Sequence, residues 1–373
     1  MDLTRQLLRG LTVTIMVTPK NLCYLNPLLS LHSPNVEPLV FPFPSHPSLP
    51  REVEQMQDLP ISFLPHIVEA LGKLHHPLHQ WFRSQQRSGK YPPVAVLSDI
   101  LLSPWTVNLA SDLDIPNICF VPFNVAAVYF WLGKPSFLLP FIGKLSRRPN
   151  EVIAWLDSCE VENSVVFIGF GTQITLTKHQ MKAVAVALEE SGVRFIWAVK
   201  EPMKRAEDGD DDQRLIPQGF EDKVKGKGLV IRGWVPQVTI LKHRAVGSYL
   251  THCGWNSALE AIVAGVLLLA WPMQADHFQI TRLLADEVGA AIRVCKGLRT
   301  VPDATELARI LVESTTVKQP QRARAMELQK TALTAIREGG SSYQALDELM
   351  ERFSGFGIDC SKIGTLDIIR SSM

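Results

Sequence analysis

One continuous stretch of the chain, residues 234–277, constrains the fold more than any other part of the sequence. Within it, residues 247–251 (GSYLT) have the aromatic and β-branched composition of a buried strand, and an apolar helical run follows at residues 258–265. Only a short polar turn separates the two. A strand, a tight turn and a helix in immediate succession are typical of an α/β protein, because parallel strands need crossover helices.

The turn itself has the residues of an anion-binding site. Gly254 permits close approach of the backbone, and Asn256 and Ser257 are common helix-capping residues. The first amides of a helix have no intrahelical partner and lie at its positive end, so a diphosphate is a natural ligand. Taken singly, His252 fits a core histidine and Trp255 a core aromatic better, but their joint spacing favours a binding site.

Residues 234–277, WVPQVTILKHRAVGSYLTHCGWNSALEAIVAGVLLLAWPMQADH, resemble the signature box of the plant secondary-product UDP-glycosyltransferases without a gap. The resemblance implies an α/β fold of the GT-B type, with two facing Rossmann-like domains, each built on a doubly wound parallel sheet. The sugar donor would bind to the carboxy-terminal domain. Because the UDP-sugar is a co-substrate, we expect neither a cofactor nor a metal ion.

The resemblance also implies which residues bind the donor. Trp234 would stack on the uracil beside Gln237, and Glu260 would bind the two ribose hydroxyls. Two groups share the other roles: the diphosphate is assigned to His252, Asn256 and Ser257, and the sugar to Trp255, Asp276 and His277. The complete set is Gly171, Thr172, Trp234, Val235, Gln237, His252, Gly254, Trp255, Asn256, Ser257, Glu260, Asp276 and His277.

The last residue of the box bears on the choice of sugar. Glucosyltransferases of this family usually have Gln at this position, whereas this chain has His277. A neutral imidazole offers one donor and one acceptor in a geometry different from that of an amide. Flanking stretches such as HRAVGSYLTH and LLAWPMQADHF resemble the flavonol 7-O-rhamnosyltransferases, so we expect UDP-rhamnose, with UDP-glucose and UDP-galactose as the alternatives.

A second glycine loop, residues 169–172 (GFGT), follows an expected strand at 164–168 and precedes an expected helix at 178–191. This position can bring backbone amides and the hydroxyl of Thr172 against a phosphate. A lone Gly-x-Gly pair fits a plain tight turn equally well. In the resembling family the loop contacts the donor diphosphate, and Thr172 is often a serine.

Composition excludes several classes of partner. Lys plus Arg (38) nearly balance Asp plus Glu (37), so we expect neither nucleic acid nor an anionic membrane surface as a partner. The sequence contains no apolar run long enough for a membrane helix. The 6 cysteines are widely spaced without a zinc-site pattern, which favours reduced thiols in the cytosol. We expect a cytoplasmic monomer.

The amino-terminal half shows an alternating α/β pattern, with an expected helix at 2–9, strands at 13–18, 94–98 and 118–122, and a helical region at 61–83. Asp99 follows one of these strands and matches the family's aspartate that orients the catalytic histidine. That histidine would occur in a Gly-His motif, and no Gly-His pair occurs in the sequence. The remaining histidines of this half are expected in loops and on the surface, and none is assigned as a substitute base.

We expect three segments in the chain. Residues 1–146 form an incomplete acceptor-binding domain with a linker, residues 147–353 form the UDP-sugar-binding domain with closing helices from residue 321, and residues 354–373 form an unrelated tail. The family's first strand would lie upstream of Met1, and several dozen family residues are missing after Trp131. These departures suggest a truncated or mis-spliced gene model.

The sequence thus predicts an inverting transferase that moves a sugar, preferably rhamnose, from UDP to a hydroxyl of a flavonol-like phenolic acceptor. The alternative is a donor-binding protein that has lost its base. A dinucleotide-dependent oxidoreductase is excluded, because no Gly-x-Gly-x-x-Gly motif follows an early strand.

Overall fold

The computed structural model describes residues 2–32, 35–51, 53–56, 59–87, 93–121, 149–171, 174–200, 216–233, 235–316 and 319–356. The expected site residues Thr172 and Trp234, the expected boundary at 146/147 and most of the tail lie outside this part of the chain. Two compact units make up the chain. The first comprises Met1–Pro122, Ser136–Leu139 and Glu338–Met373, and the second comprises Phe123–Pro135 and Pro140–Arg337.

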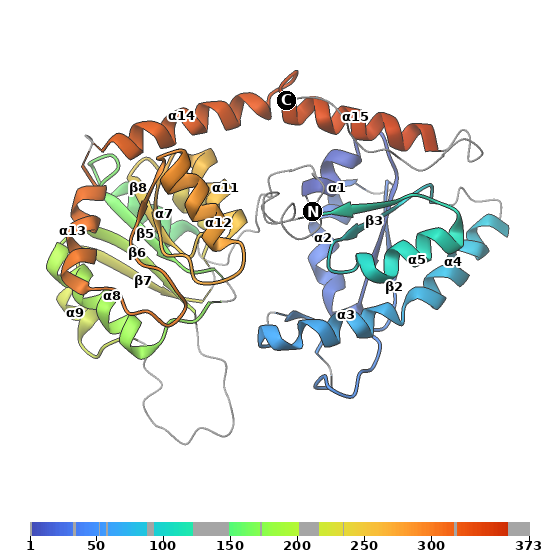
Figure 1. Ribbon diagram of the computed structural model, residues 1–373, viewed down its shortest axis with the longest axis horizontal. Helices are drawn as coiled ribbons and strands as arrows, with labels where there is room; N and C mark the ends of the chain where they lie inside the picture. Colours follow the sequence, from blue (N-terminus) through green and yellow to red (C-terminus); the bar gives the residue numbers. More distant parts are fainter. Residues whose placement is uncertain are drawn as a thin grey trace. The chain divides into compact units, whose positions relative to one another are not determined.

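The second unit is built on a six-stranded sheet with the order β10-β9-β8-β5-β6-β7, and every neighbouring pair is parallel (Figure 1). From β5 the chain runs outward through β6 and β7, then returns to β8 on the other side of β5. The direction of winding therefore reverses between β5 and β8, where such sheets bind ligands at their carboxyl ends. The strands are β5 (Val165–Gly169), β6 (Arg194–Val199), β7 (Gly228–Arg232), β8 (Val246–Thr251), β9 (Leu267–Ala270) and β10 (Ala291–Arg293).

Helices cover both faces of this sheet (Figure 1). Alternate residues of β5 belong to two different hydrophobic clusters: Val166 and Ile168 pack with α8 and α13, whereas Val165 and Phe167 pack with α7 and α11. Every residue of β5 and β8 is buried, as expected for a parallel sheet enclosed by helices. The helices are α7 (Pro149–Asp157), α8 (Lys178–Ser191), α9 (Phe220–Lys223), α10 (Gln237–Leu241), α11 (Trp255–Ala264), α12 (His277–Thr281), the π-helix η4 (Arg282–Glu287), α13 (Ala304–Ser314) and α14 (Pro320–Ala335).

The first unit contains two separate parallel pairs, β1 with β2 and β3 with β4. The parallel pairing in both units confirms the expected α/β class. The elements are α1 (Asp2–Leu7), β1 (Val13–Val17), η1 (Pro19–Leu25), α2 (Asn26–His32), β2 (Val36–Val40), η3 (Ile61–Phe63), α3 (Leu64–Gly72), α4 (His75–Arg87), β3 (Val96–Asp99), α5 (Ser103–Leu113), β4 (Asn117–Phe120) and α15 (Ser341–Phe356).

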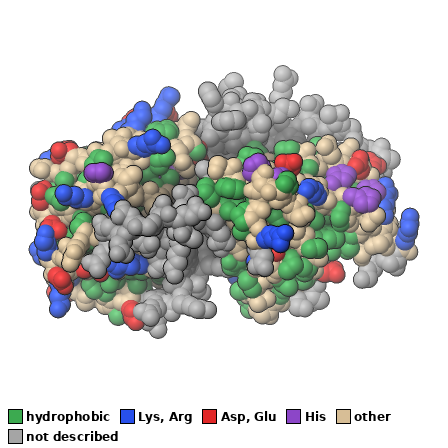
Figure 2. Space-filling view, turned by 90° about the horizontal axis from the view of Figure 1, so that it is seen from below, with side chains coloured by type: hydrophobic (Ala, Val, Ile, Leu, Met, Phe, Trp, Pro, Cys, Tyr) green, Lys and Arg blue, Asp and Glu red, His purple; other side chains and the backbone are tan. Residues whose placement is uncertain are grey.

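The described core of the first unit is small. One cluster forms where Phe82 of α4 meets Leu109 and Leu113 of α5. In contrast to the enclosed strands of the second unit, two large hydrophobic residues of the strands here are exposed: Val40 at 42% and Leu97 at 36%. Figure 2 shows hydrophobic side chains gathered on the visible face of this unit, in the right half of the view. A two-stranded parallel pair buries little apolar surface on its own.

Several expected elements differ from the structure. The helical region expected at 61–83 is divided into η3, α3 and α4. The expected closing region also consists of two helices, α14 and α15, which belong to different units. Arg9 of the first unit pairs with Asp347 of α15 at 3.3 Å, so the carboxy-terminal helix packs with amino-terminal elements. Within the described helices, none combines the length and apolarity needed to cross a membrane.

Candidate donor-binding site

Two loops come together at the reversal point of the six-stranded sheet. The parallel register pairs Gly169, the last residue of β5, with Thr251, the last residue of β8. The loop that continues from β5 through Gly171 and the turn that continues from β8 through His252 therefore leave the sheet side by side. The two glycine-containing motifs singled out in the sequence thus meet at one place.

The side chain of His252 lies between two glycine backbones. A Cβ atom at Gly171 would lie 2.8 Å from Cε1 of His252, and a Cβ atom at Gly254 would lie 2.5 Å from its Nε2. Such short contacts essentially do not occur, so no side chain fits at either position without a shift. Gly171 also has a φ of 68°, in the left-handed region that favours glycine. The two glycines thus fix the position of the imidazole.

His252 is uncharged at neutral pH. Burial and, to a smaller extent, the neighbouring His277 together lower the pKa of its imidazole from 6.5 to about 3. The hydroxyl of Thr251 lies 3.3 Å from Nδ1 of His252. A neutral imidazole can donate one N–H bond to a phosphate oxygen without adding a buried charge when the site is empty.

His277, the last residue of the box, packs against this imidazole. The two rings meet edge to face, with centroids 4.7 Å apart. His277 is 7% exposed, and its Nδ1 accepts a hydrogen bond from the backbone N–H of Gln274 at 3.3 Å. Because Nδ1 accepts, the proton of the neutral ring is on Nε2. Burial lowers the pKa of His277, and this effect is partly opposed by Asp276.

The start of α11 differs from the expectation. Asn256 and Ser257 do not cap the helix, because Gly254 is the N-cap and α11 begins at Trp255. Both residues lie in the first turn, and no side chain caps the helix end. The hydroxyl of Ser257 is instead 3.3 Å from Nε2 of Gln237. Because the N-cap Gly254 has no side chain, the first amides of α11 have no capping partner among the described residues. They therefore remain suited to an anion.

Gln237 and Glu260 lie together beside this helix start. The amide Nε2 of Gln237 donates to Oε2 of Glu260 at 2.8 Å. Burial raises the pKa of the Glu260 carboxyl, and the Gln237 bond partly opposes this rise. Val235, also expected to bind the donor, is 8% exposed and packs in the core cluster beneath. The side-chain oxygens of Glu260 could accept bonds from two neighbouring hydroxyls, as a ribose presents them.

Tyr249 is a member of this network that the sequence analysis did not identify. Its ring is fully buried and stacks on Phe167, with centroids 4.8 Å apart. Its hydroxyl donates to Oε1 of Gln237 at 2.9 Å and lies 3.4 Å from Oγ of Ser257. A tyrosine inside a buried strand needs a partner for its hydroxyl. This requirement was the feature of the sequence that could have identified Tyr249. Tyr249 orients the amide that holds Glu260.

Strained backbone is also found in this site. Cys253 has a φ of 62° and Ala275 a φ of 48°, which are unusual for residues other than glycine. The first lies directly between His252 and Gly254, and the second directly precedes Asp276. Such strain persists where the surrounding structure holds the backbone in place, and it is frequent at ligand sites.

Asp99, the expected orienting carboxylate, is the last residue of β3 in the first unit. It accepts the backbone N–H of Leu101 at 2.8 Å, and burial raises its pKa. Among the described residues, no histidine forms a hydrogen bond with it. His75 instead pairs with Asp112 at 3.1 Å, and His76 lies 2.8 Å from the amide of Gln80.

Three potential metal ligands also lie together in the first unit. One ligand atom from each of His46, His66 and Glu69 falls within 4.8 Å of the others. Nδ1 of His46 accepts the N–H of Ser48 at 3.2 Å, so its Nε2 carries the proton and donates to Glu69 at 3.1 Å. A metal at this nitrogen would have to displace that proton. The arrangement therefore fits a tether of the loop to α3 better than a metal site.

Comparison with known proteins agrees with this geometry. Residues 113–320 match the family described as UDP-glucuronosyl and UDP-glucosyl transferase. The chain is 46% identical over 407 aligned positions to a flavonol 7-O-rhamnosyltransferase of Arabidopsis thaliana, with 94% of this chain and 93% of that protein covered. It is 39% identical to a flavonol 3-O-glucosyltransferase of the same plant, over 96% of this chain and 94% of that protein.

Solved structures give the same result. The crystal structure of A. thaliana UGT89C1 complexed with UDP-L-rhamnose is similar with a TM-score of 0.85 at 45% identity, and 94% of each chain is covered. The same protein complexed with quercetin gives a TM-score of 0.82 at 44% identity, over 94% of each chain. The sequence box, the parallel folds and these similarities agree: this chain belongs to the family of UDP-glycosyltransferases.

Proposed function

We propose that this protein binds a UDP-sugar at the carboxyl ends of β5 and β8 and transfers its sugar to a flavonol-type phenol. The observation that carries the proposal is the position of His252, which Gly171 and Gly254 hold beside the unpartnered amides of α11. Glu260 and Gln237 lie next to this anion site, and the carboxylate of Glu260 could accept bonds from the ribose hydroxyls. The named activities of the two A. thaliana relatives support the same donor and acceptor classes.

Rhamnose is the sugar that we favour. The proposal rests on His277, whose Nε2 carries a proton and whose ring adjoins that of His252. It is supported by the similarity to a structure that holds UDP-L-rhamnose. Asp276 and Trp255 complete the proposed sugar contacts, while Asn256 and Ser257 contribute the amides that bind the diphosphate. UDP-glucose is the second candidate donor, since a glucosyltransferase is also among the relatives.

The transfer step has two chemical requirements. The leaving UDP needs its growing negative charge stabilised, which the amides of α11 and the N–H of His252 can provide. The acceptor hydroxyl needs a base that removes its proton while the sugar carbon is attacked from the opposite face. Asp99 would orient such a base. The bond that forms joins the acceptor oxygen to the sugar carbon, and the bond that breaks joins that carbon to the diphosphate oxygen.

A specific observation favours a second function. The sequence contains no Gly-His pair, and among the described residues no histidine bonds to Asp99. A chain that holds the donor without a base would act as a UDP-sugar-binding protein. Both functions use the same donor site, and they differ only in turnover.

We further propose that the protein works as a cytosolic monomer without a metal or other cofactor. All five cysteines of the described chain are unpaired, as is common in a reducing compartment. The near-neutral charge balance gives no reason to invoke a nucleic acid or a membrane surface. Dialysis against a chelator should leave both donor binding and any transfer unchanged.

Calorimetry with UDP and UDP-rhamnose, paired with mass-spectrometric detection of rhamnosylated quercetin, tests the proposal. Binding with product establishes the transferase. Binding without product establishes the donor-binding protein, and no binding of either nucleotide by the folded chain overturns the proposed site. The Glu306→Ala variant serves as a control, because this carboxylate lies on the exposed face of α13 and pairs with Arg309.

A further inference from the structure

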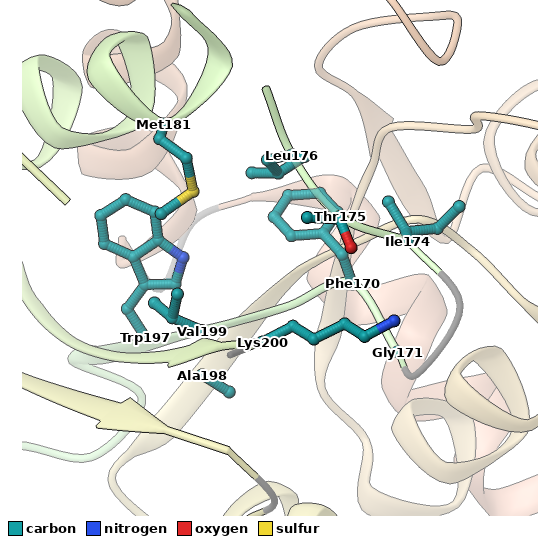
Figure 3. Close-up of a pocket in the computed structure, with 10 residues that line it drawn as sticks. All are labelled: Phe170, Gly171, Ile174, Thr175, Leu176, Met181, Trp197, Ala198, Val199 and Lys200. Atoms are coloured by element: carbon teal, nitrogen blue, oxygen red, sulfur yellow. The ribbon is translucent and has the colours of Figure 1, made fainter. Parts of the chain in front are cut away.

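A small cavity opens beside the proposed diphosphate site. Its volume is about 30 Å³, which is room for little more than one water molecule. Phe170 and Gly171 line it from the β5 loop, and Trp197 and Lys200 line it from the end of β6 (Figure 3). The cavity is too small for a base or a sugar, so its importance lies in the side chain that extends along it.

Lys200 is placed at the level of the glycine loop by the sheet itself. The parallel register pairs Ile168 of β5 with Trp197 of β6. Three positions further along the chain from this pair, the two segments reach Gly171 and Lys200. Figure 3 shows the lysine side chain running along the cavity toward Gly171. Its ammonium group therefore faces the loop that, with His252, forms the proposed diphosphate site.

Among the described residues, no acidic side chain pairs with Lys200. Its neighbours in the cavity wall are mainly apolar, including Phe170, Trp197 and Val199. Within the described parts of the chain, Lys200 forms no ion pair or hydrogen bond. The methylene stem can lie along this apolar wall while the ammonium end stays at the mouth. An ammonium group at the mouth of the cavity is placed to attract an anionic ligand in the adjoining glycine loop.

We propose that Lys200 is a further donor-binding residue, whose ammonium group contacts the diphosphate of the UDP-sugar and stabilises the charge on UDP as it leaves. This inference rests on the proposed function, because it needs a UDP-sugar in the site. The target is the diphosphate rather than the uracil or the sugar, since the lysine side chain extends from the end of β6 toward Gly171. Lys200 differs from the signature-box residues because it lies outside residues 234–277.

The test compares UDP with uridine, which lacks the diphosphate. Calorimetry is run on the wild type and on the Lys200→Met and Lys200→Arg variants. Lys200→Met should lower the affinity for UDP by about tenfold and leave that for uridine unchanged, as expected for one charge-assisted bond. Lys200→Arg should retain most of the UDP affinity. Lys227→Met is the matched control, because Lys227 is exposed and precedes the amino end of β7, whereas Lys200 follows the carboxyl end of the parallel neighbour β6.

The possible results distinguish the proposed donor-binding function from the proposed role of Lys200. If the wild type fails to bind UDP, the proposed function falls, whatever Lys200 does. If the wild type binds UDP and Lys200→Met binds it equally well, the role of Lys200 is refuted while the donor site stands. An equal loss for UDP and uridine would show damage to the pocket and would also overturn the diphosphate contact. A weaker salt dependence of UDP binding in Lys200→Met than in Lys227→Met would support the contact.

Discussion

The imidazole of His277 packs edge-on against that of His252, with ring centroids 4.7 Å apart and ring planes at 86°. The residue proposed to select the sugar therefore touches the residue proposed to bind the diphosphate. Burial keeps both rings uncharged at neutral pH. The two proposed roles, discrimination between sugars and stabilisation of the leaving group, would therefore be physically linked.

Changing His277 to Gln should alter the choice of sugar. The amide retains a donor and an acceptor but places them differently, so the preference should move from UDP-rhamnose toward UDP-glucose by about tenfold. The measurement is the ratio of dissociation constants for the two donors, and the ratio of kcat/KM where turnover occurs. An unchanged ratio would remove His277 from the specificity site. Binding of UDP alone serves as the control and should change little.

Stability should decrease as the pH falls below neutral. The folded-state pKa of His252 is lowered from 6.5 to about 3, so in this window the unfolded chain binds a proton that the folded chain does not. Stability from this group is therefore complete above pH 6.5 and is lost as the pH falls, by about 2 kcal/mol at about pH 5. Glu260 acts in the opposite direction, because its pKa is raised.

The His252→Gln variant isolates this contribution. Urea unfolding is measured at about pH 7 and about pH 5 for the variant and the wild type. Because glutamine does not titrate, the variant should lose less stability between the two pH values. Equal losses in both proteins would show that His252 is not the group responsible.

The Glu260→Ala variant should bind every UDP-sugar more weakly, by about 1 to 3 kcal/mol, because the ribose hydroxyls lose their acceptor. Calorimetry with UDP, UDP-rhamnose and UDP-glucose should give the same loss for all three. A loss confined to one sugar would contradict the ribose role. Since Glu260 has a raised pKa, UDP affinity of the wild type should also decline on acidification before an ordinary glutamate titrates.

Replacing Gly171 by Ala should disturb His252 directly. The new Cβ would lie 2.8 Å from the imidazole, in addition to the strain of a φ of 68°. Gly219 has a similar φ of 77° but open space around it, so Gly219→Ala measures the backbone strain alone. We expect a loss of about 1 kcal/mol in the control and about 2 kcal/mol more in Gly171→Ala. Only the latter should also weaken UDP binding.

Arg322 of α14 should be essential for the stability of the second unit. Its buried guanidinium donates to the carbonyls of Gly247 and Ser314 and to Oδ1 of Asn163. The Arg322→Met variant leaves these acceptors unpaired and should cost about 3 kcal/mol of unfolding free energy. Arg324→Met, on the exposed side of the same helix, should change it little. Chemical denaturation of both variants decides the point.

The sequence predicted secondary-structure elements most accurately where capping residues mark both ends of the element. The helix expected at 178–191 matches α8, because a capping box of Thr177 and Gln180 begins it and Gly192 ends it in the left-handed conformation. The strand β2 was missed, since Pro38 lies within it and proline is rare in central strands. β2 pairs with β1 on one side only, among the strands described. An edge position tolerates this residue.

The sequence indicated which residues of the box lie close together, but not their local geometry. Gln237, Ser257 and Glu260 are in contact in the structure, and their roles toward the donor stay predictions. The assignment of Asn256 and Ser257 as capping residues was wrong, because local preference cannot show that Gly254 occupies the cap. The role of Tyr249 depends on a side-chain contact across the turn, which spacing along the chain does not reveal.

The return of α15 to the first unit affects the order in which the protein can fold during synthesis. Asp347, the partner of Arg9, is synthesised only after the second unit up to Arg337. The six strands and two hydrophobic clusters of the second unit are complete before that point. The elements around Arg9, although made before the second unit, therefore gain the contacts of α15 only after it, and a chain released before α15 would leave them without its cover.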